Sequence, residues 1–440
     1  MLKVLNSLEV TSKRTLKESI LTNLSHDEAE LFKKIGIATY SPEISYNIKK
    51  YPRPVAYAGT NTLAAAIDGL KTLSSRQLTG NAAIKYLTEL EGSLSAEDGE
   101  VLFRIVKKDL RCGLTESTMN KIWPDLIYTP PYQRCSSFNK KNLAKLRLPA
   151  FSQTKSDGMY VDIIAGPTNV IYRSRNCEVK PYNNQALDGQ FTPGFVYMGE
   201  ALYTDENGKI MSRKDGNGRL NADDVDTSRI VFVLWDIVPI ADYNARMCKI
   251  KYSTRLNTLK LAIAGKSDAL RLVDTKVVNS VKEIIEHFKE EVAKGEEGTV
   301  IKNQDGFWAD HTSPDQVKCK IEFECELEII ALEEGTGKNA GRLGAAVCAS
   351  SDRKLVTGVG IGFSDKQRQE LWDDPATVGK IITVKANDVV KDRNRDVFAL
   401  FLPRNIAAVE VRTDKTVADT YERIVEQMNA FVDTLEAIGK

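Results

Sequence analysis

Cysteine and histidine, which build most disulfide frameworks and many metal centres, are scarce in this sequence. It contains seven cysteines and three histidines among 440 residues. No two cysteines have CxxC spacing and no histidine pair lies near them, which argues against structural zinc, and the odd number of cysteines argues against a closed disulfide framework. The three histidines show no ligand spacing either, so we predict that they are incidental: His26, His287 and His311.

A long apolar run and an excess of one charge are also missing. No stretch approaches the roughly eighteen apolar residues of a membrane-spanning helix, and the N-terminus lacks the apolar core of a signal peptide. The 61 basic residues almost balance the 60 acidic ones. We therefore expect an intracellular protein without a membrane partner, whose affinity for nucleic acid, if any, comes from local patches.

The spacing of apolar residues changes along the chain. In the first 130 residues, "NTLAAAIDGL" and "EDGEVLFRIVKKDL" place apolar side chains three and four apart, which predicts helices. From about residue 150, short alternating runs predict antiparallel strands, with a hairpin turn at Asn207-Gly208 and helices over 280–293 and 416–437. Beyond about residue 322 the short strands suit a small barrel. We predict a multidomain α+β protein with an all-helical N-terminal region, an antiparallel α+β middle and a C-terminal barrel.

One short motif carries the chemistry. In "FSQTKSDGMYVDI" a lysine precedes an Asp-Gly turn, so that Lys155, Asp157 and Gly158 form K-x-D-G. Alone the motif is weak, because a surface lysine before a turn has the same letters. The alternative is a nucleophile, since an amine held among cations can lose its proton near neutral pH and attack a phosphorus or carbonyl centre.

Further motifs follow in a fixed order. They are "YRSRNC", "FVYMGEAL", "VLWDIVP", "EEGTVIK", "VKCK" and "VRTDK". In this order they resemble the motifs of the covalent nucleotidyltransferase superfamily, and among its members those of ATP-dependent DNA ligases. The stretches "LTGNAAI", "DLRCGLTESTMNKIWP", "KYSTRLNTL" and "LFLPRNIAAVEVRTDKTVADT" are similar to DNA ligases of T-even bacteriophages, and they lie partly outside the catalytic motifs.

The resemblance implies an architecture and an activity. Residues 1–130 correspond to a helical DNA-binding domain, 131–321 to the nucleotidyltransferase (adenylation) domain and 322–440 to an OB-fold domain. The enzyme implied is an ATP- and Mg²⁺-dependent DNA ligase that seals nicks in duplex DNA during replication, repair and recombination. Its intermediate is a covalent lysine-AMP, from which AMP passes to the 5′-phosphate before the 3′-hydroxyl attacks. A monomer in the cytoplasm of a phage-infected host cell is expected.

The resemblance also assigns residues to the nucleotide. Lys155 is the nucleophile. Glu200 and Glu297 bind Mg²⁺ or the ribose hydroxyls, since Mg²⁺ takes oxygen ligands and retains waters. The remaining nucleotide-binding residues are Gln153 at the base edge, Arg175 of the Ser-Arg motif, Trp235 stacked on adenine, Lys302, Lys318 and Lys320 around the phosphates, and Arg412 and Lys415 of the barrel at the pyrophosphate. Trp235 as a core aromatic, Glu297 and Lys302 as solvated strand ends, and Arg412 and Lys415 as caps of the last helix remain the alternatives.

Two basic stretches are candidate DNA contacts. In "RCGLTEST", Gly113 and Thr115 open a predicted helix whose N-terminal amides can bind phosphate, with Lys121 following. The stretch "SRKDGNGRL", residues 212–220, is predicted to be a flexible basic loop whose DNA-binding side chains are Arg213, Lys214 and Arg219. An ordinary capped helix and a solvated loop are the respective alternatives.

Three positions depart from the family pattern. Tyr160 stands where the family usually has Arg, Met198 where it usually has Asp, and Cys177 where it commonly has Gly. If the turn near Gly166 closes a hairpin, residue 160 lies roughly opposite residues 173–175. We hypothesise that Arg173 replaces the missing cation and contacts DNA.

Three other functions are compatible with parts of the pattern. An RNA ligase is the nearest, although the ligase-like helical segments argue against it. A GTP-dependent capping-type nucleotidyltransferase differs in the nucleotide that labels it. A non-catalytic nick-binding protein is conceivable because of Tyr160 and Met198, but the retained lysines and glutamates argue against it.

Overall fold

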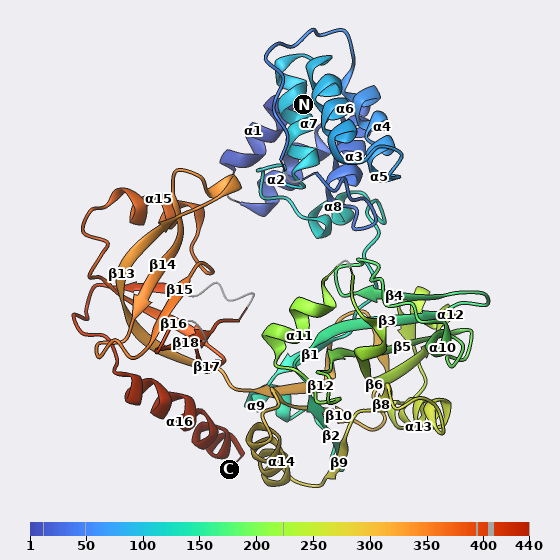
Figure 1. Ribbon diagram of the computed structural model, residues 1–440, viewed down its shortest axis with the longest axis vertical. Coiled ribbons are helices and arrows are strands. Elements are labelled where there is room, and N and C mark those ends of the chain that lie inside the picture. Colours follow the sequence, from blue (N-terminus) through green and yellow to red (C-terminus); the bar gives the residue numbers. More distant parts are fainter. Residues whose placement is uncertain (12, 49, 223, 393–394, 404–408, 440) are drawn as a thin grey trace. The chain divides into compact units, whose positions relative to one another are not determined.

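The computed structural model describes residues 1–11, 13–48, 50–222, 224–392, 395–403 and 409–439 (Figure 1). The chain forms two compact units. Unit 1 comprises Met1–Pro131 and Ile171–Pro181, and unit 2 comprises Tyr132–Val170 and Tyr182–Lys440. Strand β4 (Val170–Ser174) spans one of these boundaries, because Val170 belongs to unit 2 and the following residues belong to unit 1. The predicted mixed α+β class with a helical N-terminal region is confirmed.

Unit 1 is built from helices packed around one apolar core. Polar caps start several of them: in α3, Ser25 and Glu28 form a capping box, and in α7 the Ser95 hydroxyl accepts from the Asp98 amide. Fully buried Leu5, Phe32 and Leu87 come from three different helices, so the core joins the helices that the periodicity predicts. The helices are α1 (Leu2–Val10), α2 (Arg14–Thr22), α3 (His26–Tyr40), α4 (Leu63–Gly69), α5 (Lys71–Ser74), α6 (Gly80–Gly92), α7 (Ala96–Val106) and α8 (Glu116–Ile122).

The first sheet of unit 2 has the strand order β1-β12-β10-β2-β9. Its bounds are β1 (Arg134–Ser137), β2 (Ala150–Lys155), β9 (Thr275–Val278), β10 (Gly298–Asn303) and β12 (Thr312–Lys320). The β1–β12 pair is parallel and the other pairs are antiparallel. Helix α14 (Val281–Ala293) packs Ile284, Ile285 and Phe288 against Ile301 and Cys319 on one face of this sheet. The helix predicted over 280–293 is therefore confirmed, and it leaves the other face for the site.

A second sheet of unit 2 has β3, β5, β6 and β8 side by side in that order. Its strands are β3 (Met159–Ala165), β5 (Phe195–Tyr203), β6 (Ile230–Pro239) and β8 (Leu270–Leu272). The Asn207-Gly208 turn is confirmed, since Thr204 and Ile210 bridge across it and Gly208 has φ 77°. The other elements between residues 132 and 322 are α9 (Lys140–Leu143), α10 (Gln185–Asp188), α11 (Arg213–Leu220), η1 (Thr227–Arg229), α12 (Ile240–Asn244), β7 (Met247–Cys248), α13 (Tyr252–Ile263) and β11 (Trp308–Ala309).

The C-terminal part of unit 2 is the predicted barrel-like region of short strands. A five-stranded sheet has the order β15-β14-β13-β16-β19, beside a β17-β18 pair. The predicted helix over 416–437 begins five residues later, because the backbone of Asp419 is still hydrogen-bonded to Glu326 and Thr420 caps the first turn. Its elements are β13 (Phe323–Glu334), η2 (Gly337–Asn339), β14 (Leu343–Ala349), β15 (Val356–Val359), α15 (Asp365–Asp373), β16 (Ile381–Ala386), β17 (Asp388–Lys391), β18 (Phe398–Phe401), β19 (Val409–Arg412) and α16 (Tyr421–Gly439).

The prediction of a flexible loop over 212–220 is wrong. Residues Arg213–Leu220 form helix α11. The Ser212 hydroxyl donates to Asp215 Oδ2 at 2.7 Å, and Leu220 is buried at the far end of the helix. These two anchors outweigh the weak helix propensity of the glycines between them. The side chains of Arg213 and Lys214 lie outside the described residues, and that of Arg219 is exposed.

Candidate active site

The register of the first sheet brings five predicted residues onto one face. Lys155 pairs with Gly298, which pairs on its other side with Lys320. Two residues further along β10, Val300 pairs with Gln153 on one side and with Lys318 on the other. Lys302 lies another two residues along the same strand. Because alternate residues of a strand share a face, the nucleophile candidate, the base-edge candidate and three lysines face the same way. α14 covers the opposite face.

Lys155 is held by carboxylates. Its Nζ donates to Glu297 Oε2, and the Glu297 amide donates to the Lys155 carbonyl at 3.1 Å. Burial works to lower the pKa of Lys155, but the nearby Glu297 and Glu200 carboxylates oppose it and leave the pKa raised. The expectation that cations lower the pKa of this amine is therefore wrong. Its charged neighbours favour the ammonium form.

Glu200 comes from the second sheet. It lies on β5 and pairs with Tyr160 of β3 and Val233 of β6. Burial raises the pKa of Glu200 to about 7 against the lowering effect of Lys155. Gly158 lets the chain approach this strand, because a Cβ there would lie 2.5 Å from the Ala201 carbonyl oxygen. The glycine of K-x-D-G is thus required by the contact that sets Lys155 near Glu200.

A buried hydroxyl that sequence analysis missed joins two predicted residues. Tyr252 of α13 is 3% exposed. Its hydroxyl accepts a hydrogen bond from Lys302 Nζ at 3.1 Å and lies 2.9 Å from Gln153 Oε1. Burial lowers the pKa of Lys302 to about 8. Lys302 is therefore a buried group of the site, which rules out the alternative of a solvated strand end. Tyr252 lies in the ligase-like stretch "KYSTRLNTL". A single sequence gives no signal that marks this tyrosine as part of the site.

Trp235 occupies a β-bulge. Met198 pairs with Asp236 and Gly199 with Leu234, so the register skips Trp235 between them. The half-buried indole lies 5.9 Å from the ring of Tyr160 and 5.9 Å from Lys302 Nζ. The bulge thus turns Trp235 toward groups of the site, while its stacking on a base stays a prediction.

The three departures from the family pattern have structural roles. The Tyr160 hydroxyl donates to Asp162 Oδ1 at 2.7 Å. Met198 is 3% exposed and packs with Val196 in an apolar cluster, so it supplies no polar atom to the site. Cys177 has φ 65°, a left-handed conformation that glycine adopts without strain, which explains why glycine is common at this position.

Arg412 and Lys415 lie together in the barrel region. Arg412 Nη1 and Lys415 Nζ bind the two oxygens of the Glu326 carboxylate, and Arg412 also binds Asp414 at 2.7 and 2.5 Å. Arg412 ends strand β19. The alternative that these two residues cap the last helix is therefore wrong, whereas their role at a pyrophosphate stays a prediction.

The predicted DNA contacts of unit 1 are placed as follows. Gly113 has φ 61°, and Thr115 is the N-cap of α8. Lys121 lies on this helix in an ion pair with Glu18, with 2.8 Å between Nζ and each carboxylate oxygen. Arg173 Nη1 donates to the Tyr128 hydroxyl at 3.2 Å. Arg173 and Arg175 group with unit 1, so the replacement of a cation at Tyr160 and the nucleotide contact of Arg175 stay predictions.

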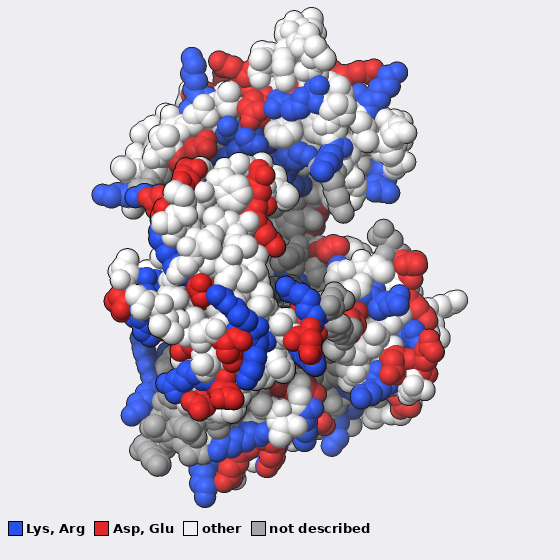
Figure 2. Space-filling view, turned by 60° about the vertical axis from the view of Figure 1, so that its left-hand side comes forward, with Lys and Arg blue, Asp and Glu red and all other residues white. Residues whose placement is uncertain are grey.

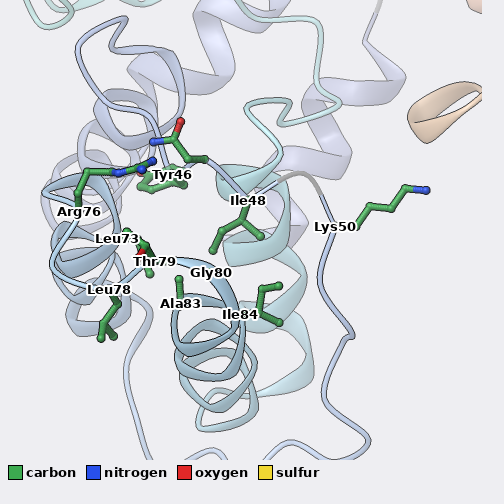
Figure 3. A pocket seen from close by; sticks show the side chains of 11 residues that line it. Tyr46, Ile48, Lys50, Leu73, Arg76, Leu78, Thr79, Gly80, Ala83 and Ile84 are labelled. Carbon is green, nitrogen blue, oxygen red and sulfur yellow. The ribbon is translucent and has the colours of Figure 1, made fainter. Parts of the chain in front are cut away.

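Unit 1 also contains a cavity of about 440 Å³ (Figure 3). The ligase-like stretch "LTGNAAI" lines it with Leu78, Thr79, Gly80, Ala83 and Ile84. Its remaining lining comes from residues near Tyr46 and Leu73. None of the predicted nucleotide-binding residues lines this cavity, and its lining residues all belong to unit 1.

The acidic residues of the site suit a magnesium ion that shares its ligands with a substrate. Within the described ranges, no three His, Cys, Asp or Glu side chains are grouped so that they can hold a metal ion by themselves. Mg²⁺ is usually bound by one or two carboxylates together with waters and substrate phosphates. Glu200 and Glu297 fit that pattern.

The helices of the described residues include none with both the length and the apolar character of a membrane-spanning segment.

Comparison with known proteins agrees with this arrangement. Residues 133–320 match the "ATP dependent DNA ligase domain" family and residues 334–402 match the "DNA ligase OB-like domain" family. The DNA ligases of Enterobacteria phages T6 and T4 are each 29% identical over 482 aligned positions, covering 96% of this chain and 98% of theirs. The solved structure "Pmar-Lig_PreS3" covers 91% of this chain and 97% of its own, with a TM-score of 0.72 and 24% identity, and so supports the fold. The chain belongs to the ATP-dependent DNA ligases.

Proposed function

We propose that this protein seals nicks in duplex DNA through a lysine-AMP intermediate on Lys155. The Lys155 amine, once it has lost a proton, attacks the α-phosphorus of ATP. A phosphorus–nitrogen bond forms and the bond to pyrophosphate breaks. AMP then passes from the nitrogen to the 5′-phosphate of the nick. Finally the adjacent 3′-hydroxyl attacks that phosphorus, a phosphodiester bond forms and AMP leaves.

One observation carries the proposal. Lys155, Gly298 and Lys320 form a single row across three strands, with Glu297 bonded to Lys155 both through its side chain and through its backbone. The row sets a nucleophile beside a carboxylate that can take its proton and beside a cation that can bind phosphate oxygens. Fixed charges of this kind stabilise a phosphoryl group in transfer without having to reorganise.

The remaining site residues have distinct proposed roles. Lys302, Lys318 and Lys320 neutralise phosphate oxygens, and Arg412 and Lys415 orient the pyrophosphate. Glu200 and Glu297 hold Mg²⁺, which when bound neutralises charge on the phosphates. Trp235 stacks on adenine, and Gln153 reads the base edge. Arg175 is a further nucleotide contact.

We also propose three domains with the bounds 1–130, 131–321 and 322–440, and a monomer that binds nicked DNA. Figure 2 shows both signs of charge over the face in view, with Lys and Arg side chains gathered on part of the helical unit. Backbone contacts with DNA require such local basic groups when the whole chain has a net charge of only +1. The candidates are Gly113, Thr115, Lys121, Arg173, Arg213, Lys214 and Arg219.

A nick-sealing assay with two substrates tests the order of steps. Lys155→Ala is expected to abolish sealing of a nick with a plain 5′-phosphate, because no AMP is loaded. The same variant is expected to seal a nick whose 5′-phosphate already carries AMP, because the last step does not use the Lys155 amine as a nucleophile. Sealing of the plain nick by the variant contradicts the proposal. The same assay on a matched nick in RNA distinguishes a DNA ligase from the alternative of an RNA ligase.

A further inference from the structure

The Gln153 amide can recognise either purine, depending on which way it faces. Adenine presents the hydrogen-bond donor of its 6-amino group where guanine presents the acceptor O6. An amide oxygen opposite this position accepts from adenine, whereas an amide nitrogen donates to guanine. Gln153 is 1% exposed and lies on the same sheet face as Lys155. Whatever fixes its amide can therefore select the nucleotide.

A hydrogen-bond chain runs through this amide. Lys302 Nζ donates to the Tyr252 hydroxyl at 3.1 Å, and that hydroxyl lies 2.9 Å from Gln153 Oε1. On the other side, Gln153 Nε2 donates to Thr275 Oγ1 at 3.0 Å, and Thr275 Oγ1 donates to the Val273 carbonyl at 3.0 Å. The chain starts at an ammonium, which can only donate, and ends at a carbonyl, which can only accept.

The Thr275 end of the chain decides the orientation. The Tyr252 hydroxyl also lies 2.7 Å from the Trp235 carbonyl, so it can satisfy its proton there and accept from a reversed amide. At the other end, a reversed amide would place its oxygen against Thr275 Oγ1. The single hydroxyl proton would then have to leave the Val273 carbonyl, and Val273 is 3% exposed. Losing this partly buried hydrogen bond disfavours the reversed amide.

We propose that Thr275 is a positioning residue that fixes the Gln153 amide and thereby makes the site select ATP over GTP. Thr275 is well placed for this, since it pairs directly with Gln153 across the β2–β9 ladder. Thr275 has no proposed contact with the nucleotide itself. The inference rests on the proposed function, in which Lys155 takes AMP from ATP and Gln153 faces the base.

The test compares labelling by the two nucleotides. Nucleotide-free full-length protein is incubated with Mg²⁺ and either ATP or GTP, and the rates of the AMP and GMP adducts are measured by intact mass. Thr275→Val keeps the side-chain shape and removes the hydroxyl. It is expected to lower the ATP-to-GTP rate ratio about ten-fold or more, whereas Thr275→Ser is expected to retain the ratio. Thr258→Val is the matched control, since the Thr258 hydroxyl donates to the Thr254 carbonyl along α13.

A double variant separates positioning from general damage. In a Gln153→Leu background the amide is gone, so adding Thr275→Val is expected to change the ratio no further. If Thr275→Val lowers the labelling rates with ATP and GTP equally, the rate ratio is unchanged and the inference is overturned. The AMP adduct formed in that experiment would still uphold the proposed function. The absence of any adduct on the unmodified chain overturns the proposed function, and the inference with it.

Discussion

Replacing Arg255 with Met should destabilise the nucleotidyltransferase region by about 3–5 kcal/mol, because it removes one partner of a buried ion pair. Arg255 and Asp236 are each 3% exposed, and two hydrogen bonds of 2.8 and 3.0 Å join them. Arg255 Nη1 also donates to the Ile250 carbonyl. The pair fastens α13 to β6, and the guanidinium lies 5.4 Å from the ring of Tyr252 on the same helix. The variant should therefore also loosen Tyr252.

The assay is calorimetric unfolding of the full chain. For a folding unit of about 150–250 residues, each kcal/mol shifts the transition temperature by about 2–4 °C, so a shift of roughly 6–20 °C is expected. A double variant, Arg255→Met with Asp236→Leu, should be less destabilised than the sum of its single variants by about 1–3 kcal/mol, since neither charge is then left buried alone. Strict additivity, or a loss below about 1 kcal/mol in Arg255→Met, would refute this reasoning.

Three further outcomes are expected. Gly298→Ala should lower the free energy of unfolding by about 1–3 kcal/mol and slow AMP labelling. Gly298 has φ 142°, and a Cβ there would lie 2.2 Å from the Cys319 carbonyl oxygen. The control for melting and labelling is Gly358→Ala, because a Cβ at Gly358 has no heavy atom within 4 Å. His287→Ala should cost about 1–3 kcal/mol, because His287 Nδ1 lies 2.7 Å from the buried Ser152 hydroxyl. Burial lowers the pKa of His287, so the stability that His287 contributes is present above its unfolded pKa of about 6.5 and is lost as pH falls through the folded pKa. The denaturant midpoint of His287→Ala should therefore change less between about pH 7.5 and pH 5 than that of the unmodified chain. Parallel pH profiles for the two proteins would contradict this. Affinity for a nicked duplex should fall at least about ten-fold between roughly 50 and 200 mM salt, and an affinity that does not change with salt would exclude backbone contacts as its source.

The predictions that succeeded rest on periodicity and local turn chemistry. The helical N-terminal region, the helix at Val281–Ala293 and the turn at Gly208 follow from side-chain spacing and backbone preference, which a single sequence contains. The face shared by Lys318 and Lys320 follows in the same way from strand alternation. What joined them to Lys155 was the order of motifs in the resemblance, because no local rule gives the pairing of strands far apart in sequence.

The predictions that failed depended on tertiary neighbours. Lys155 was expected among cations, but the fold places Glu297 and Glu200 beside it. His287 was predicted to be incidental from its lack of ligand spacing alone, which carries no information on its hydrogen bond with Ser152 on the face of β2 opposite Lys155. Tyr252 was not singled out at all, although it joins Lys302 to Gln153. In each case the decisive partner is more than fifty positions away or on another element, where single-sequence patterns carry no signal.

The central claim is that Lys155 carries AMP, and intact mass of the protein tests it most directly. Nucleotide-free full-length protein incubated with ATP and Mg²⁺ should gain the mass of a single AMP, and Lys155→Ala should gain none. Lys318→Ala, which keeps the amine of Lys155 and removes a phosphate-binding cation, should still form the adduct at a lower rate. An adduct that persists in Lys155→Ala, or none on the unmodified chain, would contradict the account.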